Sequence, residues 1–124
     1  LKEGRINEVD INDISNQIEE LGMSDERAMF SQLSRLIAHL LKWKYQPALR
    51  GNSWINTIED ARIEIKYFIG KSKLLEKEIL NSFEKAYQSA IRKAVIQTGL
   101  EKRSFPKECP FTLAQCLEDE FFPE

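Results

Sequence analysis

The residues with the greatest capacity for chemistry are crowded into one short block, Ala38–Trp54, which reads AHLLKWKYQPALRGNSW. This block contains the only histidine of the chain, His39, and both of its tryptophans, Trp43 and Trp54. It lies inside residues 27–58, a stretch with five Lys or Arg residues and no Asp or Glu. A neutral histidine can act as a general base, and cations interleaved with aromatic rings can bind single-stranded nucleic acid.

His39 lacks the companions that a catalytic histidine needs. On a helical wheel it shares a polar face with Arg35 and Lys42. These cations are expected to lower the pKa of the imidazole and leave it neutral near pH 7. No Ser, Cys or carboxylate lies at helical spacing to complete a nucleophile–base–orienter set, although tertiary contacts could supply one. We therefore expect a structural role, in which His39 bonds Glu19 or Glu20 or caps a contact between helices.

The sequence predicts no metal site and no cofactor. Ferritin-like metal sites use two Glu-x-x-His pairs, but Leu36 stands three residues before His39 and no second histidine exists. Cys109 and Cys116 lie seven positions apart, a spacing that matches no zinc module. We expect both to be reduced thiols, in the core or near the surface. No phosphate-binding loop or nucleotide motif is visible.

The aromatic residues of the block are expected to pack inside the protein. Trp43 and Trp54 fall on apolar helix faces beside a tight turn that Pro47 stiffens. Arg50 would tie this turn to an acidic group or to carbonyl groups at a helix end. A net charge of −2 gives nucleic acid no general electrostatic support. Binding to nucleic acid would need a basic stripe made of Arg27, Arg35, Lys42, Lys44 and Arg50.

The elements that position these residues are predicted to be helices. Apolar residues recur at helical spacing, and no stretch alternates like a strand. Gly22, Gly70 and Gly99 are expected to end three of the helices, and Ser24 to cap one. The predicted long helices cover residues 10–21, 24–45, 54–69 and 74–98, and a short helix covers residues 113–121.

These helices should enclose one core. The helix over 24–45 has the broadest apolar arc, which indicates neighbours on more than one side. Small alanines on the helix over 74–98 should allow another helix to approach closely. Phe121 and Phe122 are expected to dock on the protein's own surface or on another subunit. We therefore predict an all-α, single-domain bundle over residues 1–124, with four long helices and a short C-terminal helix.

Several motifs resemble one protein family. They are IEELG at 18–22, HLLKWKYQP at 39–47, RGNSW at 50–54, FPKECP at 105–110 and the closing FFPE. They occur in the family's order, and nearly the whole chain resembles the domain of unknown function 29 family. The resemblance implies a small, all-helical bacterial protein, common in cyanobacteria, with no assigned activity. It also implies that about twenty residues of the family pattern are missing before Leu1.

We expect a non-enzymatic module that binds a protein partner or assembles with itself. One alternative is a small-ligand-binding protein or an enzyme, with a pocket near His39 and Arg50. A second alternative is nucleic-acid binding through the basic stripe. No apolar run approaches the about 20 residues that a membrane span needs, and we expect a cytoplasmic location. The candidate functional surface comprises Arg35, His39, Lys42 and Arg50, with Glu19 and Glu20 as acidic partners.

Overall fold

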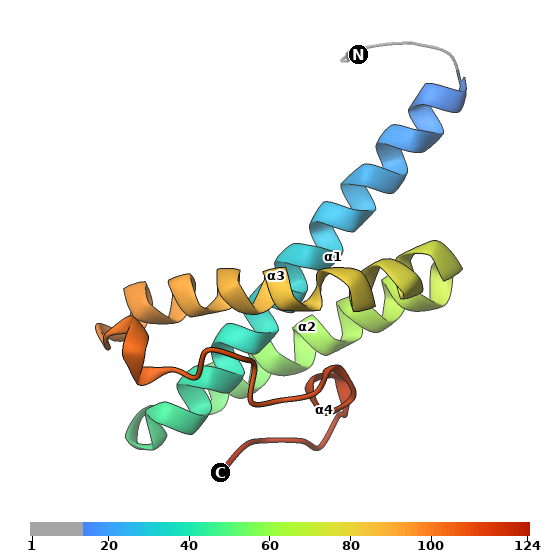
Figure 1. Cartoon of the computed structure of the whole chain (residues 1–124). Helices are drawn as coiled ribbons and strands as arrows, with labels where there is room; N and C mark the ends of the chain where they lie inside the picture. Colours follow the sequence, from blue (N-terminus) through green and yellow to red (C-terminus); the bar gives the residue numbers. More distant parts are fainter. Residues whose placement is uncertain (1–13) are drawn as a thin grey trace.

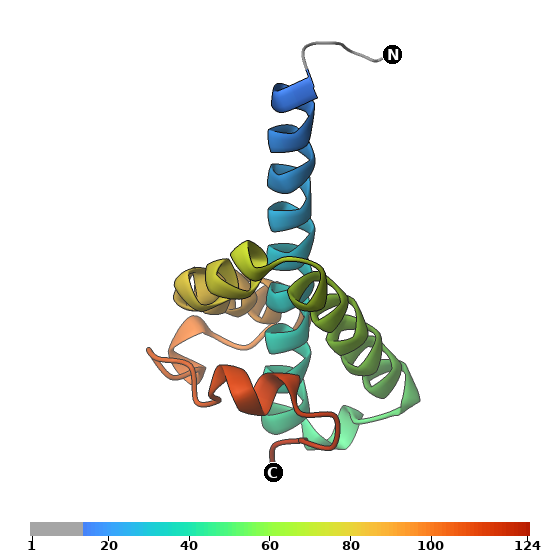
Figure 2. The ribbon, with the colours of Figure 1, turned by 90° about the vertical axis from the view of Figure 1, so that its right-hand side faces the viewer.

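The computed structural model describes residues 14–124, with side chains from Ser24 onward. The chain is helical, and no strand occurs within the described residues, which confirms the all-α prediction. α1 packs against both α2 and α3, and the C-terminal segment with α4 lies against α1 and α2 (Figures 1 and 2). The elements are α1 (Ile14–Tyr45), η1 (Pro47–Leu49), α2 (Asn52–Lys71), α3 (Lys73–Thr98), η2 (Lys102–Ser104) and α4 (Leu113–Leu117).

The predicted break at Gly22 is wrong. α1 runs without interruption over 32 residues, so Gly22 and Ser24 lie inside one helix instead of ending one and capping the next. Glycine permits the left-handed conformation that ends a helix but does not impose it, and no proline stands near Gly22 to stop the helix there. Within residues 14–124 there are therefore three long α-helices and one short α-helix, instead of the four long helices and one short helix that we predicted. Residues 10–13 of the first predicted helix lie outside the described part of the chain.

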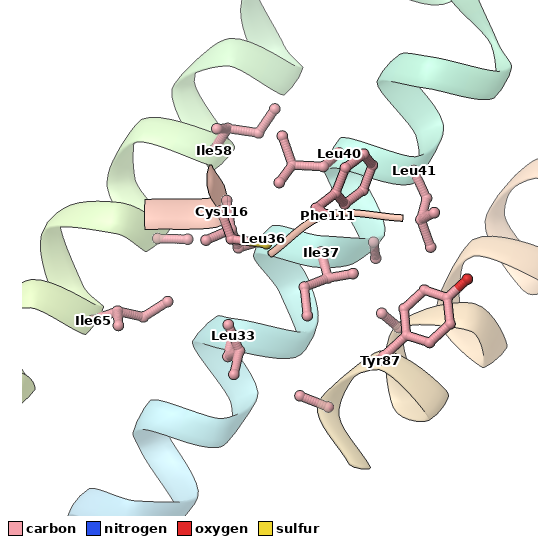
Figure 3. Close-up of a cluster of buried hydrophobic side chains, with 14 of the residues drawn as sticks. Leu33, Leu36, Ile37, Leu40, Leu41, Ile58, Ile65, Tyr87, Phe111 and Cys116 are labelled. Atoms are coloured by element: carbon pink, nitrogen blue, oxygen red, sulfur yellow. The ribbon is translucent and has the colours of Figure 1, made fainter. Parts of the chain in front are cut away.

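The core lies where α1 passes between α2 and α3 (Figure 3). Because α1 has a neighbour on each side, it needs a wide apolar arc, and the structure confirms the arc predicted for residues 24–45. The buried side chains at this crossing include Leu33, Leu36, Ile37, Leu40 and Leu41 from α1, Ile58 and Ile65 from α2, Tyr87 from α3, and Phe111 and Cys116 from the C-terminal segment.

Two glycines at helix ends behave differently. Gly99 ends α3 as predicted, with φ of 77° and its N–H donated to the Val95 carbonyl at 2.9 Å. Gly70 lies inside α2, which continues to Lys71. Ser72 then caps α3, because its hydroxyl oxygen accepts a hydrogen bond from the Leu75 amide at 3.3 Å. The boundary between α2 and α3 therefore lies at Ser72, and not at Gly70 as we expected.

Alanine at these two glycines is expected to change stability in opposite directions. Gly99→Ala should lower the free energy of unfolding by about 1–2 kcal/mol, because a side chain is strained at positive φ. Gly70→Ala should raise it by about 0.5–1 kcal/mol, because alanine is the better helix former and a Cβ there meets no atom within 4 Å. Urea denaturation of both variants checks this, and equal changes of one sign would contradict the assignment.

The C-terminal segment closes over α1 and α2. Thr112 begins α4 as predicted, in a capping box with Gln115. The helix ends at Leu117, short of the predicted residue 121, because the chain beyond it turns its carbonyl groups toward Arg62. Phe121 and Phe122 pack on the protein's own surface, with ring centroids 5.8 Å from Phe111 and 4.9 Å from Trp43, respectively.

Candidate functional site

The cationic candidate residues of α1 lie beside α3 around a cavity of about 580 Å³ that opens to solvent. The structure brings Arg35, His39 and Lys42 to this cavity, as their helical spacing predicts. We call it the cationic cavity. Its lining residues are Ser31, Arg35, Ala38, His39 and Lys42 from α1, and Lys93 and Gln97 from α3.

Lys42 is the buried cation of this cavity. Only 8% of the residue is exposed, and its Nζ donates a hydrogen bond to the Gln97 Oε1 at 2.7 Å. The same Nζ lies 5.1 Å from the centre of the Trp54 ring. Burial lowers the pKa of Lys42, because the charged amine loses solvation. Among residues 24–124, no ion pair involves Lys42, Arg35 or Lys93, so this charge has no carboxylate partner there.

His39 lies half-buried between the cations. Its Nδ1 is 3.0 Å from the Arg35 carbonyl oxygen, and because a carbonyl only accepts, Nδ1 carries the proton. The pKa of His39 is lowered mainly by burial, with smaller contributions from the charges of Lys42 and Arg35, and the backbone hydrogen bond opposes them. The predicted direction is confirmed, but burial is the larger cause. The neutral ring therefore presents the Nε2 lone pair as an acceptor.

The lowered pKa of His39 should make stability depend on pH. In the unfolded chain His39 takes up a proton near its ordinary pKa of 6.5, whereas in the folded protein it takes up the proton only at a lower pH. The unfolded state therefore binds more protons below pH 6.5, and the free energy of unfolding falls as pH decreases toward the folded-state pKa. Urea denaturation between pH 5 and 8 should show this slope in the native protein and a weaker one in His39→Gln. Equal slopes would contradict it.

The cationic cavity does not assemble a hydrolytic triad. Ser31 also lines it, but His39 follows eight positions after Ser31 in the same helix, which is about 12 Å along the axis. No Asp, Glu or Cys is among the lining residues that the structure describes. Within the described residues, no group of three or more His, Cys, Asp or Glu is placed to hold a metal ion. None of the described helices is long and apolar enough to cross a membrane.

Arg50 lies away from the cationic cavity. Its Nε donates to the Trp43 carbonyl at 2.7 Å, and its Nη2 lies 3.4 Å from the carbonyls of both Pro123 and Glu124. The Trp43 carbonyl belongs to the last turn of α1, so Arg50 holds a helix end in one of the two ways predicted. The structure therefore separates Arg50 from His39. The side chains of Glu19 and Glu20, the predicted acidic partners, lie outside the described residues.

The basic stripe does not form one surface. Lys42 is buried, Arg50 binds backbone carbonyls, and the Nζ of Lys44 lies 5.8 Å from the Tyr45 ring centroid. Trp43 packs against the core as predicted, but Trp54 is half-buried beside the Lys42 ammonium and is not among the residues packed on the core.

The comparison with protein families shows which family the chain belongs to. A family model described as "Domain of unknown function DUF29" matches residues 1–122. The chain belongs to the DUF29 family. The family resemblance of the motifs is thereby confirmed. No curated protein and no solved structure matches this DUF29 chain.

The sequence analysis of this DUF29 chain did not identify two features, namely the α3 side of the cationic cavity and the buried Arg62. Lys93 and Gln97 reach the cavity only because α3 crosses α1, and their spacing along the chain gives no sign of this. Arg62 is 1% exposed. The sequence pattern could have indicated its burial, since Arg62 stands four residues after Ile58 and next to Ala61 on the apolar arc of α2. A cation at such a position indicates a buried set of acceptors.

Proposed function

We propose that this DUF29 protein is a non-enzymatic binding module that holds an acidic segment of a partner protein in the cationic cavity. The observation that carries the proposal is Lys42, a largely buried residue whose ammonium shares the cavity with Arg35 and Lys93, while none of the described lining residues bears a carboxylate. We place the module in the bacterial cytoplasm, where its two free thiols would stay reduced.

An anion would relieve the electrostatic cost of this arrangement. A charge that loses solvation is unfavourable unless an opposite charge or several hydrogen bonds compensate it, and among the described residues the Lys42 ammonium has one amide oxygen and one aromatic ring. Arg35 and Lys93 add two more positive charges at the same cavity, and like charges repel. A carboxylate entering the cavity would interact favourably with all three cations.

His39 favours a peptide over a simple anion. With its Nδ1 bound to a carbonyl, the neutral ring offers Nε2 as an acceptor only. A peptide segment supplies backbone N–H donors next to its carboxylates, whereas a fully ionised phosphate or carboxylate offers none. Arg35 is exposed at the cavity and can form a bidentate pair with a Glu or Asp side chain. The cavity therefore suits an acidic peptide segment.

Fluorescence anisotropy with a labelled, glutamate-rich peptide tests this proposal. Lys42→Met, Arg35→Gln and Lys93→Gln should each weaken binding about threefold to tenfold at low salt. Lys77→Gln is the matched control, because Lys77 is an exposed α3 cation outside the cavity lining, and it should change binding less than twofold. Supporting results are saturable binding, this pattern of variants, and weaker competition by inorganic phosphate and by oligonucleotides than by unlabelled peptide.

Three results would overturn the proposal. Absence of saturable peptide binding would remove it directly. An equal loss in Lys77→Gln would show that the peptide responds to overall charge. Stronger competition by inorganic phosphate would identify a small-ligand site, and stronger competition by an oligonucleotide would identify a nucleic-acid site.

A further inference from the structure

Acidic and basic residues are segregated in the first half of the chain. Residues 8–20, which we call the acidic stretch, contain five Asp or Glu residues and no Lys or Arg, whereas residues 27–58 contain five Lys or Arg residues and no Asp or Glu. We infer that the partner that fills the cationic cavity is a second copy of this chain, which inserts its acidic stretch. This inference rests on the proposed function, because it names the source of the acidic segment.

The acidic stretch cannot reach the cavity of its own chain. Glu20 and Arg35 lie fifteen positions apart in the unbroken helix α1, which is about 22 Å along the axis and exceeds the combined reach of the two side chains. Residue 14 lies about 32 Å from Arg35 along the same axis, and the six residues from 8 to 13 can span at most about 20 Å. Only the acidic stretch of another copy is free of this constraint.

α1 offers a face on which a second α1 can lie. Four exposed residues, Ser24, Ala28, Ser31 and Arg35, recur there at helical spacing. The three small side chains allow another helix to approach closely. The N-terminal part of α1 extends beyond α2 and α3 (Figures 1 and 2), so there it has no neighbour among the described helices. A second α1 on this face would supply the packing that stabilises a helix in water.

Antiparallel packing of two α1 helices brings opposite charges together at both ends of the contact. When Glu20 of one copy lies opposite Arg35 of the second, Arg35 of the first lies opposite Glu20 of the second, because a twofold contact is reciprocal. The same register pairs residue 13 with residue 42, since Asp13 precedes Glu20 by seven positions and Lys42 follows Arg35 by seven. Asp13 itself lies just outside the described residues. Each cavity thus receives two carboxylates.

The same register also serves His39. Gln17 precedes Glu20 by three positions, so the pairing places it opposite residue 38 of the second copy, next to His39. A side-chain amide carries N–H donors, and the neutral His39 ring accepts a hydrogen bond at Nε2. A segment with carboxylates and an amide therefore matches both the cations and the acceptor of the cavity.

Charge reversal tests this pairing by analytical ultracentrifugation, in which we expect the native protein to form a dimer. Glu20→Arg and Arg35→Glu should each weaken self-association at least about tenfold, because each creates two like-charge contacts per dimer. An equal mixture of the two variants should dimerise again, since both contacts then join opposite charges. Lys77→Glu is the matched control, because Lys77 is exposed on α3 outside the cavity lining. It should dimerise like the native protein and should not restore dimerisation of Glu20→Arg.

The outcomes separate this inference from the proposed function. A monomeric native protein that still binds the glutamate-rich peptide would overturn the inference alone, and a monomer that binds no peptide would remove both. A dimer that both reversals leave intact, or a mixture that stays monomeric, would also overturn the inference. If circular dichroism shows that a variant fails to fold, the native protein still decides. The glutamate-rich peptide should dissociate its dimer, and a dimer that resists the bound peptide would contradict the pairing.

Discussion

Replacing Arg62 by leucine is expected to lower the free energy of unfolding by about 3–5 kcal/mol. Arg62 is 1% exposed, and its guanidinium donates from Nε to the Cys116 carbonyl at 2.7 Å, from Nη1 to the Asp119 carbonyl at 3.1 Å and from Nη2 to the Phe121 carbonyl at 2.7 Å. It also lies 5.4 Å from the Phe122 ring centroid. Leucine would leave three carbonyls without this donor, and the C-terminal segment would lose its attachment to α2.

Arg62→Lys should also destabilise the fold, because one ammonium cannot reproduce the planar fork that spans three carbonyls. Chemical denaturation measures the loss of stability, and hydrogen exchange should show faster exchange over residues 113–121. Arg103→Leu is the matched control, since Arg103 is exposed and pairs only with Glu101 among described residues. It should cost less than about 1 kcal/mol. An Arg62→Leu protein as stable as this control would contradict the attachment role.

The sequence predicts local features well where one residue decides them. Thr112 and Gly99 act as predicted, because a side-chain cap and a left-handed glycine depend on neighbouring backbone only. Gly22 and Gly70 show the limit of that reasoning. Both could end a helix, yet one lies inside α1 and the other inside α2, because the residues around each continue helical hydrogen bonding. A glycine permits an end without requiring one.

The sequence predicts the part of the candidate site that lies on one helix, but not the part that depends on how the helices pack. Arg35, His39 and Lys42 share one face of one helix, so spacing along the chain places them together. Arg50 follows only eight residues after Lys42, but the turn at Pro47 directs it toward Trp43 and the C-terminal carbonyls. Lys93 enters the site through the packing of α3 on α1, which no local pattern encodes.

The α1–α3 contact depends on small residues, and replacing one of them by a larger residue should lower the stability of the fold. Ala86, Ala90 and Ala94 are fully buried on α3, and Ser34 is 1% exposed on α1. The sequence predicted close approach from these alanines, and their complete burial supports it. Ala90→Leu is expected to lower the free energy of unfolding by about 3 kcal/mol, because the added carbon atoms must displace close-packed neighbours.

The same substitution at an exposed helical position separates packing from helix propensity. Ala28 is exposed on α1, and Ala28→Leu should change stability by less than about 0.5 kcal/mol, since alanine and leucine are both good helix formers. Urea denaturation compares the two variants. Ala90→Leu should also disturb the cationic cavity, because Lys93 lies one helical turn further along α3 and depends on the same interhelical spacing. The variant would then lose affinity for an acidic peptide as well as stability, whereas Ala28→Leu would keep both.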